Sequence, residues 1–161
     1  MTKSVSQYVG LIEPGIAATQ SGIELLRGML DERYPAPPSN ETSGIWPTSF
    51  EVGHVVFEGQ PSARFYNPMG TVHGGWISTL LDTAMACAVQ SSLAAGQRYT
   101  TIEMKTVFVK PVQERTGALR AEGVLLHAGR RVAHAEGKVF DQQGNLIAYG
   151  SETCQISEIK N

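Results

Sequence analysis

The most regular apolar pattern in the chain lies at residues 73–91. Its apolar side chains recur at helical spacing and form a belt wide enough to be buried on most sides. The pattern therefore predicts one long central helix. The belt consists of Trp76, Ile77, Leu80, Leu81, Ala84, Met85, Ala88 and Val89.

Four segments after this helix have the composition of β-strands, and each is bounded by proline or glycine. They cover residues 99–109, 117–127, 131–140 and 145–156. The connections between successive segments are short, which predicts antiparallel neighbours and hence a meander.

Side chains two residues apart share one face of a strand, and small side chains on that face allow a helix to approach closely. Such faces predict an α+β fold in which an antiparallel sheet wraps around the central helix. In the third segment the face holds Ala133, Ala135, Gly137 and Val139, and in the first it holds Ile102, Met104 and Phe108.

The first part of the chain has weaker patterns. Residues 16–30 have an amphipathic spacing that predicts an N-terminal helix, and the proline-rich residues 34–40 are predicted to be a linker. Residues 50–58 are predicted to form a single strand. We therefore divide the chain into an N-terminal helix and linker at 1–39 and a main domain at 40–161.

Composition restricts the class of protein. The chain has 161 residues, of which 42% are hydrophobic and 17% are charged, as expected of one globular domain. The net charge of -2 and the lack of a lysine or arginine run argue against a nucleic-acid partner. No apolar stretch reaches the roughly 18 residues of a membrane span, and the N-terminus lacks the apolar core of a signal peptide. A cytoplasmic location is the prediction.

The cysteines and most of the histidines predict no metal site and no cofactor. Cys87 and Cys154 form neither a disulfide framework nor a metal-ligand spacing, so both are predicted to be buried free thiols. His54, His127 and His134 fall in strand segments without a second ligand at a suitable spacing, and we interpret them as structural.

The first candidate for chemistry is the His73-Gly74-Gly75 sequence, which leads directly into the central helix. Free N–H groups at a helix N-terminus can stabilise a carbonyl oxygen that becomes negative during attack. Gly74 is the candidate donor. The alternative is that the two glycines merely permit a tight turn.

Asp82 is the second candidate, because it lies within the apolar belt, where an ionised carboxylate is costly to bury without a partner. A general base or nucleophile is the functional interpretation, and a polar anchor between helix and sheet is the structural one. His73 precedes it by nine positions, which places the two on opposite sides of the helix and about 13 Å apart along its axis. If both serve one site, two copies of the chain must contribute to it.

Two further candidates come from the predicted strands. Thr100 and Thr101 open the strand after the helix, where a hydroxyl could order a water, although threonine is also a good strand former. Arg130 and Arg131 form a predicted hairpin turn that could bind a phosphate or could simply be solvated.

Three segments carry a family resemblance: NPMGTVHGGWISTLLDTAMACA at 67–88, TTIEMKTVFVKPV at 100–112 and HAGRRVAHAEGKVF at 127–140. Together they resemble the hotdog-fold acyl-CoA thioesterases of the phenylacetate-pathway (PaaI-like) type, and the similarity extends from about residue 40 to the end. The resemblance is specific because His-Gly-Gly, an acid nine residues later and a strand followed by Lys-Pro occur in order.

The resemblance implies an acyl-CoA substrate, a homodimer whose sheets join edge to edge, and often a dimer of dimers. It implies that Asp82 attacks the thioester or activates water, and that Asn67 orients the carbonyl or the water. His73 matches the family histidine, and the Gly74 N–H would polarise the thioester carbonyl. Thr101 aligns with a serine or threonine of related enzymes. CoA would lie in a groove at the subunit interface, near Gly75, Arg130 and Arg131.

Two other functions fit the same fold. A hydratase or dehydratase acting on acyl-CoA or acyl-carrier protein is one, although the chain lacks the His-Pro-rich loop expected of that branch. A non-catalytic regulator that binds acyl-CoA is the other, and the carboxylate at Asp82 argues against it.

Overall fold

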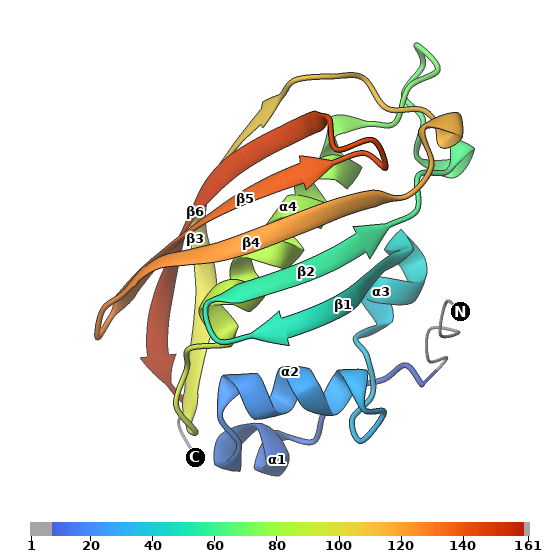
Figure 1. The fold of residues 1–161 in the computed structure, drawn as a ribbon. Coiled ribbons are helices and arrows are strands. Elements are labelled where there is room, and N and C mark those ends of the chain that lie inside the picture. Colours follow the sequence, from blue (N-terminus) through green and yellow to red (C-terminus); the bar gives the residue numbers. More distant parts are fainter. Residues whose placement is uncertain (1–7, 160–161) are drawn as a thin grey trace.

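The computed structural model describes residues 8–159. Six antiparallel strands form one sheet that wraps around a long helix (Figure 1). This confirms the predicted α+β architecture. The strands are β1 (Ile45–Glu51), β2 (His54–Gly59), β3 (Gln97–Phe108), β4 (Leu119–Ala128), β5 (Val132–Phe140) and β6 (Leu146–Glu158).

The central helix is α4 (Gly74–Gln90), and its apolar belt forms the core as predicted. The sheet approaches it closely at two glycines. A Cβ atom at Gly123 of β4 would lie 2.1 Å from the carbonyl oxygen of Ala84, and one at Gly137 of β5 would lie 2.7 Å from the Met85 side chain. On β5 the alternation holds, since Ala133, Ala135, Gly137 and Val139 are all buried.

The strand order is β1-β2-β4-β5-β6-β3, so β3 lies at an edge beside β6. The predicted meander is correct for β4, β5 and β6, but the prediction that β3 neighbours β4 is wrong. The connection between them includes the short 3-10 turn Glu114–Thr116 and is long enough to pass the ends of β5 and β6. Val112 anchors it, because this residue is buried and accepts a hydrogen bond from the Val72 N–H (2.8 Å).

The predicted shared face of β3 is also wrong in part. Ile102 sits where the pairing of β3 with β6 shifts, between Thr101 and Glu103. A bulge of this kind inserts one extra residue and reverses the alternation. Met104 is therefore half-buried, whereas the side chain of Ile102 is 59% exposed.

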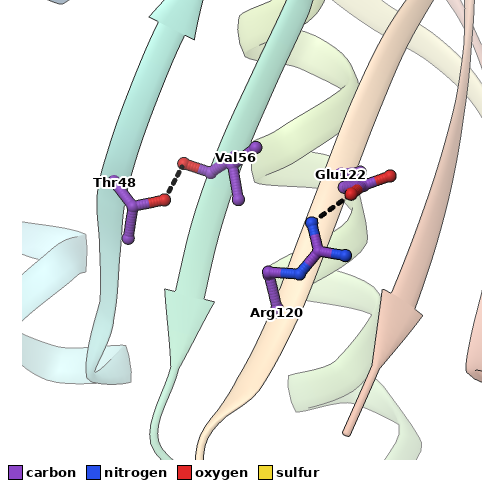
Figure 2. A network of polar contacts seen from close by, with 4 residues as sticks. All are labelled: Thr48, Val56, Arg120 and Glu122. Atoms are coloured by element: carbon purple, nitrogen blue, oxygen red, sulfur yellow. Dashed lines mark hydrogen bonds and ion pairs between the residues drawn. The ribbon is translucent and has the colours of Figure 1, made fainter. Parts of the chain in front are cut away.

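Residues 50–58 form a hairpin and not the single strand that we predicted. The chain reverses at Val52 and Gly53, where Gly53 has a φ of 78°. On the outer face of the sheet, the Thr48 hydroxyl donates to the Val56 carbonyl (3.1 Å) beside a bulge in β1 (Figure 2). Figure 2 also shows Arg120 paired with Glu122 on the same face of β4.

The N-terminal part holds three short helices: α1 (Pro14–Thr19), α2 (Gly22–Leu30) and α3 (Pro38–Ser43). The predicted helix at 16–30 is thus interrupted, because Ser21 caps α2 and its N–H donates to the Glu24 carboxylate (2.8 Å). The predicted linker contains the start of α3, with proline at its first position. Helix α2 packs against β1 (Figure 1). No helix in residues 8–159 is long and apolar enough to cross a membrane.

Candidate active site

The N-terminus of α4 carries four of the predicted residues, which we call the donor half-site: Asn67, His73, Gly74 and Gly75. His73 is exposed and caps the helix, since its Nδ1 accepts a hydrogen bond from the Gly75 N–H (2.9 Å). Its own backbone N–H donates to the Phe65 carbonyl (2.7 Å), which fixes the entry of the chain into α4. The Gly75 N–H is therefore already occupied.

Gly74 is the first residue of α4, and its N–H has no hydrogen-bond acceptor among residues 8–159. A Cβ atom at this position would lie 2.9 Å from the tip of the Phe108 ring. The Phe108 ring therefore occupies the space that a side chain at position 74 would need. A shallow groove next to it is lined by residues of the α4 N-terminus and of the segment after β3, including Lys110 and Pro111. An oxyanion in this groove could accept a hydrogen bond from the Gly74 N–H.

Asn67 shapes the loop that leads to this helix. Its Nδ2 donates to the Thr71 hydroxyl (2.9 Å), and its Oδ1 accepts from the Met69 N–H (2.9 Å) and from the Thr71 N–H (3.3 Å). The amide thus closes a tight turn before His73. In this chain its oxygen is committed to the loop, and one Nδ2 hydrogen remains available for a ligand.

The carboxylate half-site lies farther along α4 and consists of Asp82, Thr101 and Glu152. Asp82 is half-buried, and no described residue forms a hydrogen bond or ion pair with its carboxylate. Burial raises the pKa of this carboxyl group above its ordinary value. An unpaired, partly desolvated carboxylate is more basic and less hydrated than one in open water, which suits a base or a nucleophile.

Glu152 on β6 was not identified from the sequence. It is 2% exposed, and its Oε1 accepts hydrogen bonds from the Thr101 hydroxyl (2.5 Å) and the Cys154 thiol (3.0 Å). Its Oε2 has no partner among the described residues. Burial raises the pKa of this carboxyl group, the two hydrogen bonds oppose the rise, and the charge of Asp82 adds to it.

A signal for Glu152 existed in the strand alternation. Ala148, Cys154 and Ile156 are buried on the same side of β6, and Glu152 falls in phase with them. The Thr101 hydroxyl was predicted to order a water. In the structure this hydroxyl donates a hydrogen bond to the Glu152 carboxylate.

The two cysteines are free thiols, as predicted, although Cys87 is half-buried and Cys154 is fully buried. Burial is the main cause that raises the pKa of each thiol to about 12, and the Asp82 and Glu152 charges add to it. Neither thiol forms a thiolate at neutral pH, so neither is suited to nucleophilic attack.

Arg130 and Arg131 lie in the turn between β4 and β5, are exposed, and form no ion pair within the described residues. In Figure 1 this turn lies at the opposite end of the sheet from the start of α4. Within one subunit the arginines are thus remote from Gly74. In the described part of the chain, no group of three histidine, cysteine, aspartate or glutamate side chains is placed to hold a metal ion.

The two half-sites cannot act on one thioester within one subunit. Asp82 follows Gly74 by eight residues, or about 12 Å along the helix axis. The free N–H groups at a helix start point away from the rest of the helix. A carbonyl bound to Gly74 is therefore out of reach of the Asp82 carboxylate on the same chain.

Comparison with known proteins places the fold in a family. Residues 69–148, from the loop before α4 into β6, match the thioesterase superfamily. The proofreading thioesterase EntH of Klebsiella pneumoniae is 32% identical over 113 residues, which cover 70% of this chain and 78% of that protein.

Solved structures of similar fold agree with this family match. A putative thioesterase of Ralstonia eutropha, described as related to phenylacetic acid degradation, superposes with a TM-score of 0.73 at 29% identity, covering 80% of this chain and 97% of that one. A Streptococcus mutans protein bound to acetyl CoA shares the fold, with a TM-score of 0.65 at 24% identity, covering 73% and 91% of the two chains. The chain therefore belongs to the thioesterase superfamily and is a hotdog-fold thioester hydrolase.

Proposed function

We propose that the chain hydrolyses acyl-CoA thioesters to the free acid and CoA, at active sites that two copies of the chain form together. The observation that carries this proposal is the separation of an unoccupied backbone donor at Gly74 from an unpaired, half-buried carboxylate at Asp82. A second copy must supply the half-site that the first copy cannot bring close.

Strand β3 suits the joining of two copies. It is an edge strand in which Ile102 and Phe108 are 59% and 51% exposed, and Val109, which follows it directly, is 47% exposed. An exposed strand edge with apolar side chains is a template for pairing with another chain. Antiparallel pairing of two β3 strands about a two-fold axis would join the two sheets into one.

The same pairing would assemble the half-sites. Thr101, near the start of β3, belongs to the carboxylate half-site, and Phe108, at the end of β3, covers Gly74 of the donor half-site. Two antiparallel copies of β3 place the start of one strand beside the end of the other. Each donor half-site would then face the carboxylate half-site of the partner, which makes two equivalent active sites.

In this arrangement the Gly74 N–H binds the thioester carbonyl oxygen and stabilises the negative charge that develops on it. Asp82 of the facing copy either removes a proton from a water that attacks the carbonyl carbon, or attacks that carbon itself and forms an anhydride, which water then hydrolyses to the free acid and the regenerated carboxylate. The carbon–sulfur bond breaks and CoA leaves as the thiol after it takes up a proton. His73 and Asn67 hold the loop, and Thr101 orients the carboxylate half-site. Gly75, next to the bound carbonyl, and Arg130 and Arg131 of the facing copy would contact the CoA portion.

Release of free CoA from acyl-CoA thioesters, followed with a chromogenic thiol reagent, tests the proposal. We expect the wild type to release thiol and the Asp82→Asn variant to lose at least about 100-fold in kcat. Circular dichroism would establish that the variant is folded. Near-normal turnover by folded Asp82→Asn, or a monomer by light scattering at assay concentration, would rule out the proposed site. Binding of acyl-CoA without thiol release would favour a dehydratase or a regulator.

A further inference from the structure

Glu152 of β6 is a buried acid that has no role in the reaction proposed above. It is 2% exposed, and its neighbours on the buried side of β6 are Ala148, Cys154 and Ile156. A carboxyl group in such surroundings is costly unless hydrogen bonds or a function compensate for its burial. Two donors reach its Oε1, whereas its Oε2 is buried and has no partner among residues 8–159.

A β-bulge determines which residue of β3 lies opposite Glu152. The pairing of β3 with β6 shifts between Thr101 and Glu103, so that Met104 is the partner of Glu152. Without the extra residue of the bulge, Glu103 would lie opposite Glu152, and like charges in this position are destabilising. Glu103 is instead exposed, and its carboxylate accepts a hydrogen bond from the Thr153 hydroxyl (3.3 Å). The hydroxyl of Thr101 is then the polar group that β3 presents to Glu152.

The hydrogen bonds at Glu152 fix the direction of the Thr101 hydroxyl. Thr101 donates to Oε1 (2.5 Å), and the Cys154 thiol donates to the same oxygen (3.0 Å). An oxygen that accepts two hydrogen bonds carries no proton itself, so a proton on Glu152 would occupy Oε2. The Cys154 sulfur, 3.9 Å from the hydroxyl, is a weak acceptor that competes poorly with a carboxyl oxygen. Thr101 therefore presents only lone pairs to any other group, whether Glu152 is ionised or neutral.

Asp82 approaches the same group from α4. Its half-buried carboxylate has no hydrogen-bond or ion-pair partner among residues 8–159. Its charge adds to the effect of burial in raising the pKa of the Glu152 carboxyl group and that of the Cys154 thiol. Because Glu152 and Cys154 both contact Thr101, the Asp82 carboxylate and the Thr101 lone pairs border one region of the carboxylate half-site. Both groups are hydrogen-bond acceptors there.

We propose that Glu152 is a positioning residue for hydrolysis, because it keeps the Thr101 hydroxyl an acceptor and so makes the attacking water donate one hydrogen to Thr101 and the other to Asp82. The proposal rests on the thioesterase function proposed above and concerns its route through an attacking water. A water that donates both hydrogens into the half-site turns its lone pairs toward the thioester carbonyl held by the facing copy. A freely rotating Thr101 hydroxyl could instead donate to the Asp82 carboxylate, which would make that carboxylate a weaker base.

One hydrogen of the water moves in this step, and the other stays. The water oxygen bonds to the carbonyl carbon as one proton passes to Asp82, and the carbonyl electron pair moves onto the oxygen held by Gly74. The carbon–sulfur bond then breaks, the sulfur keeps the electron pair, and the thiolate takes up the proton from Asp82. The second hydrogen remains on the new hydroxyl of the acid. Glu152 neither gains nor loses a proton, so it acts only through Thr101.

A double-mutant cycle of Thr101→Val and Glu152→Met tests this role. Thiol release is measured with whichever of acetyl-CoA, hexanoyl-CoA and benzoyl-CoA the wild type hydrolyses fastest. Methionine removes the acceptor, and we expect kcat to fall about 10- to 100-fold with KM unchanged, because the water and not the substrate loses its orientation. In the Thr101→Val background Glu152→Met should add little, since no hydroxyl remains to be held. Losses that multiply in the double variant would overturn the proposal.

Two further variants separate positioning from a purely structural effect. Glu152→Gln keeps an acceptor oxygen for Thr101 and should keep most of kcat. Glu136→Met removes an exposed acid from the neighbouring strand β5 and should leave kcat and KM unchanged. Circular dichroism and urea unfolding establish that each variant is folded. A folded Glu152→Gln variant as slow as Glu152→Met, or a Glu152→Met variant with the kcat of the wild type, would contradict the role of the acceptor.

Infrared spectroscopy distinguishes a failure of this proposal from a failure of the thioesterase function, because it requires no turnover. The carboxyl band of Glu152 is identified by its absence from the spectrum of Glu152→Gln. Loss of the hydroxyl donor in Thr101→Val should shift this band. An unshifted band would show that Thr101 does not donate to Glu152 and would refute the proposal, even if the wild type releases thiol. A shifted band in a protein that releases no thiol would support the hydroxyl orientation and refute the reaction.

Discussion

Gly74 combines two properties at one position, a backbone N–H without an acceptor and a lack of side chain. The Phe108 ring covers the space that a Cβ would occupy, at 2.9 Å from the ideal Cβ position. The ring tip belongs to a half-exposed side chain and can move. The N–H and the space beside it can therefore be tested separately.

Gly74→Pro should abolish the oxyanion contact and keep the helix. Proline is well tolerated at the first position of a helix, and the preceding His73 already has the extended backbone (φ -61°, ψ 135°) that proline favours. We expect kcat to fall about 100- to 1,000-fold, as for the loss of one oxyanion donor. Gly74→Ala meets Phe108 in the same way but keeps the N–H. Equal losses in the two variants would show that space, and not the N–H, is what matters.

Glu152 is the second residue whose environment has measurable consequences. Burial raises the pKa of its carboxyl group in the folded protein, despite the hydrogen bonds from Thr101 and Cys154. The folded state then holds a proton more tightly than the unfolded chain does. The free energy of unfolding must therefore fall as the pH rises from the ordinary pKa of a glutamate to the raised value, and it levels off above that.

Glu152→Gln should weaken this pH dependence. Glutamine can still accept the Thr101 hydrogen bond but cannot ionise. Urea unfolding between about pH 4 and pH 7 should show a smaller loss of stability for Glu152→Gln than for the wild type. Glu136→Gln, at an exposed position on β5, is the matched control. Identical pH profiles for wild type and Glu152→Gln would contradict the account of this carboxyl group.

At the scale of elements, regular periodicity was sufficient for α4 and β5. Their apolar positions follow one spacing from end to end, and each buries the predicted face. The β1–β2 hairpin could not be predicted, because its turn at Val52 and Gly53 lacks the Asn-Gly or Asp-Gly pair that marks tight hairpins. Nor does sequence spacing reveal that β3 crosses to the far edge, since that depends on how the sheet closes around α4.

The close approach of α4 to the sheet gives a prediction at this scale. Gly123→Ala would place a methyl group 2.1 Å from the backbone carbonyl of Ala84, where neither element can yield easily. We expect a loss of about 3 kcal/mol or more in the free energy of unfolding, at or beyond the upper end for overpacking. Gly15→Ala, in α1 with open space around it, should be neutral or slightly stabilising. Thermal and urea unfolding of the two variants would show the difference. A loss below about 1 kcal/mol for Gly123→Ala would mean that the layers are looser than described.

At the scale of the whole molecule, the sequence located the parts of the candidate site but not their arrangement. Asp82 stood out because a carboxylate in an apolar belt requires an explanation, and Gly74 because it starts a helix. Glu152 was missed because its partners, Thr101 and Cys154, come from elsewhere on the sheet and become neighbours only when β3 pairs with β6. The separation of Gly74 and Asp82 along α4 follows from helix geometry, so it could be predicted from the sequence, and the second copy that completes the site is our proposal.

A shared site can be tested by mixing two inactive proteins. In a dimer of Asp82→Asn with Gly74→Pro, one site carries both defects, and the other combines Gly74 of the first chain with Asp82 of the second. Random pairing of equal amounts makes half of the dimers mixed, so co-expression should restore about a quarter of the wild-type rate. Each variant expressed with a tagged copy of itself is the control and should show no gain. A mixed dimer, isolated with two different tags, that remains as inactive as its parents would place both half-sites on one chain and refute the two-copy active site.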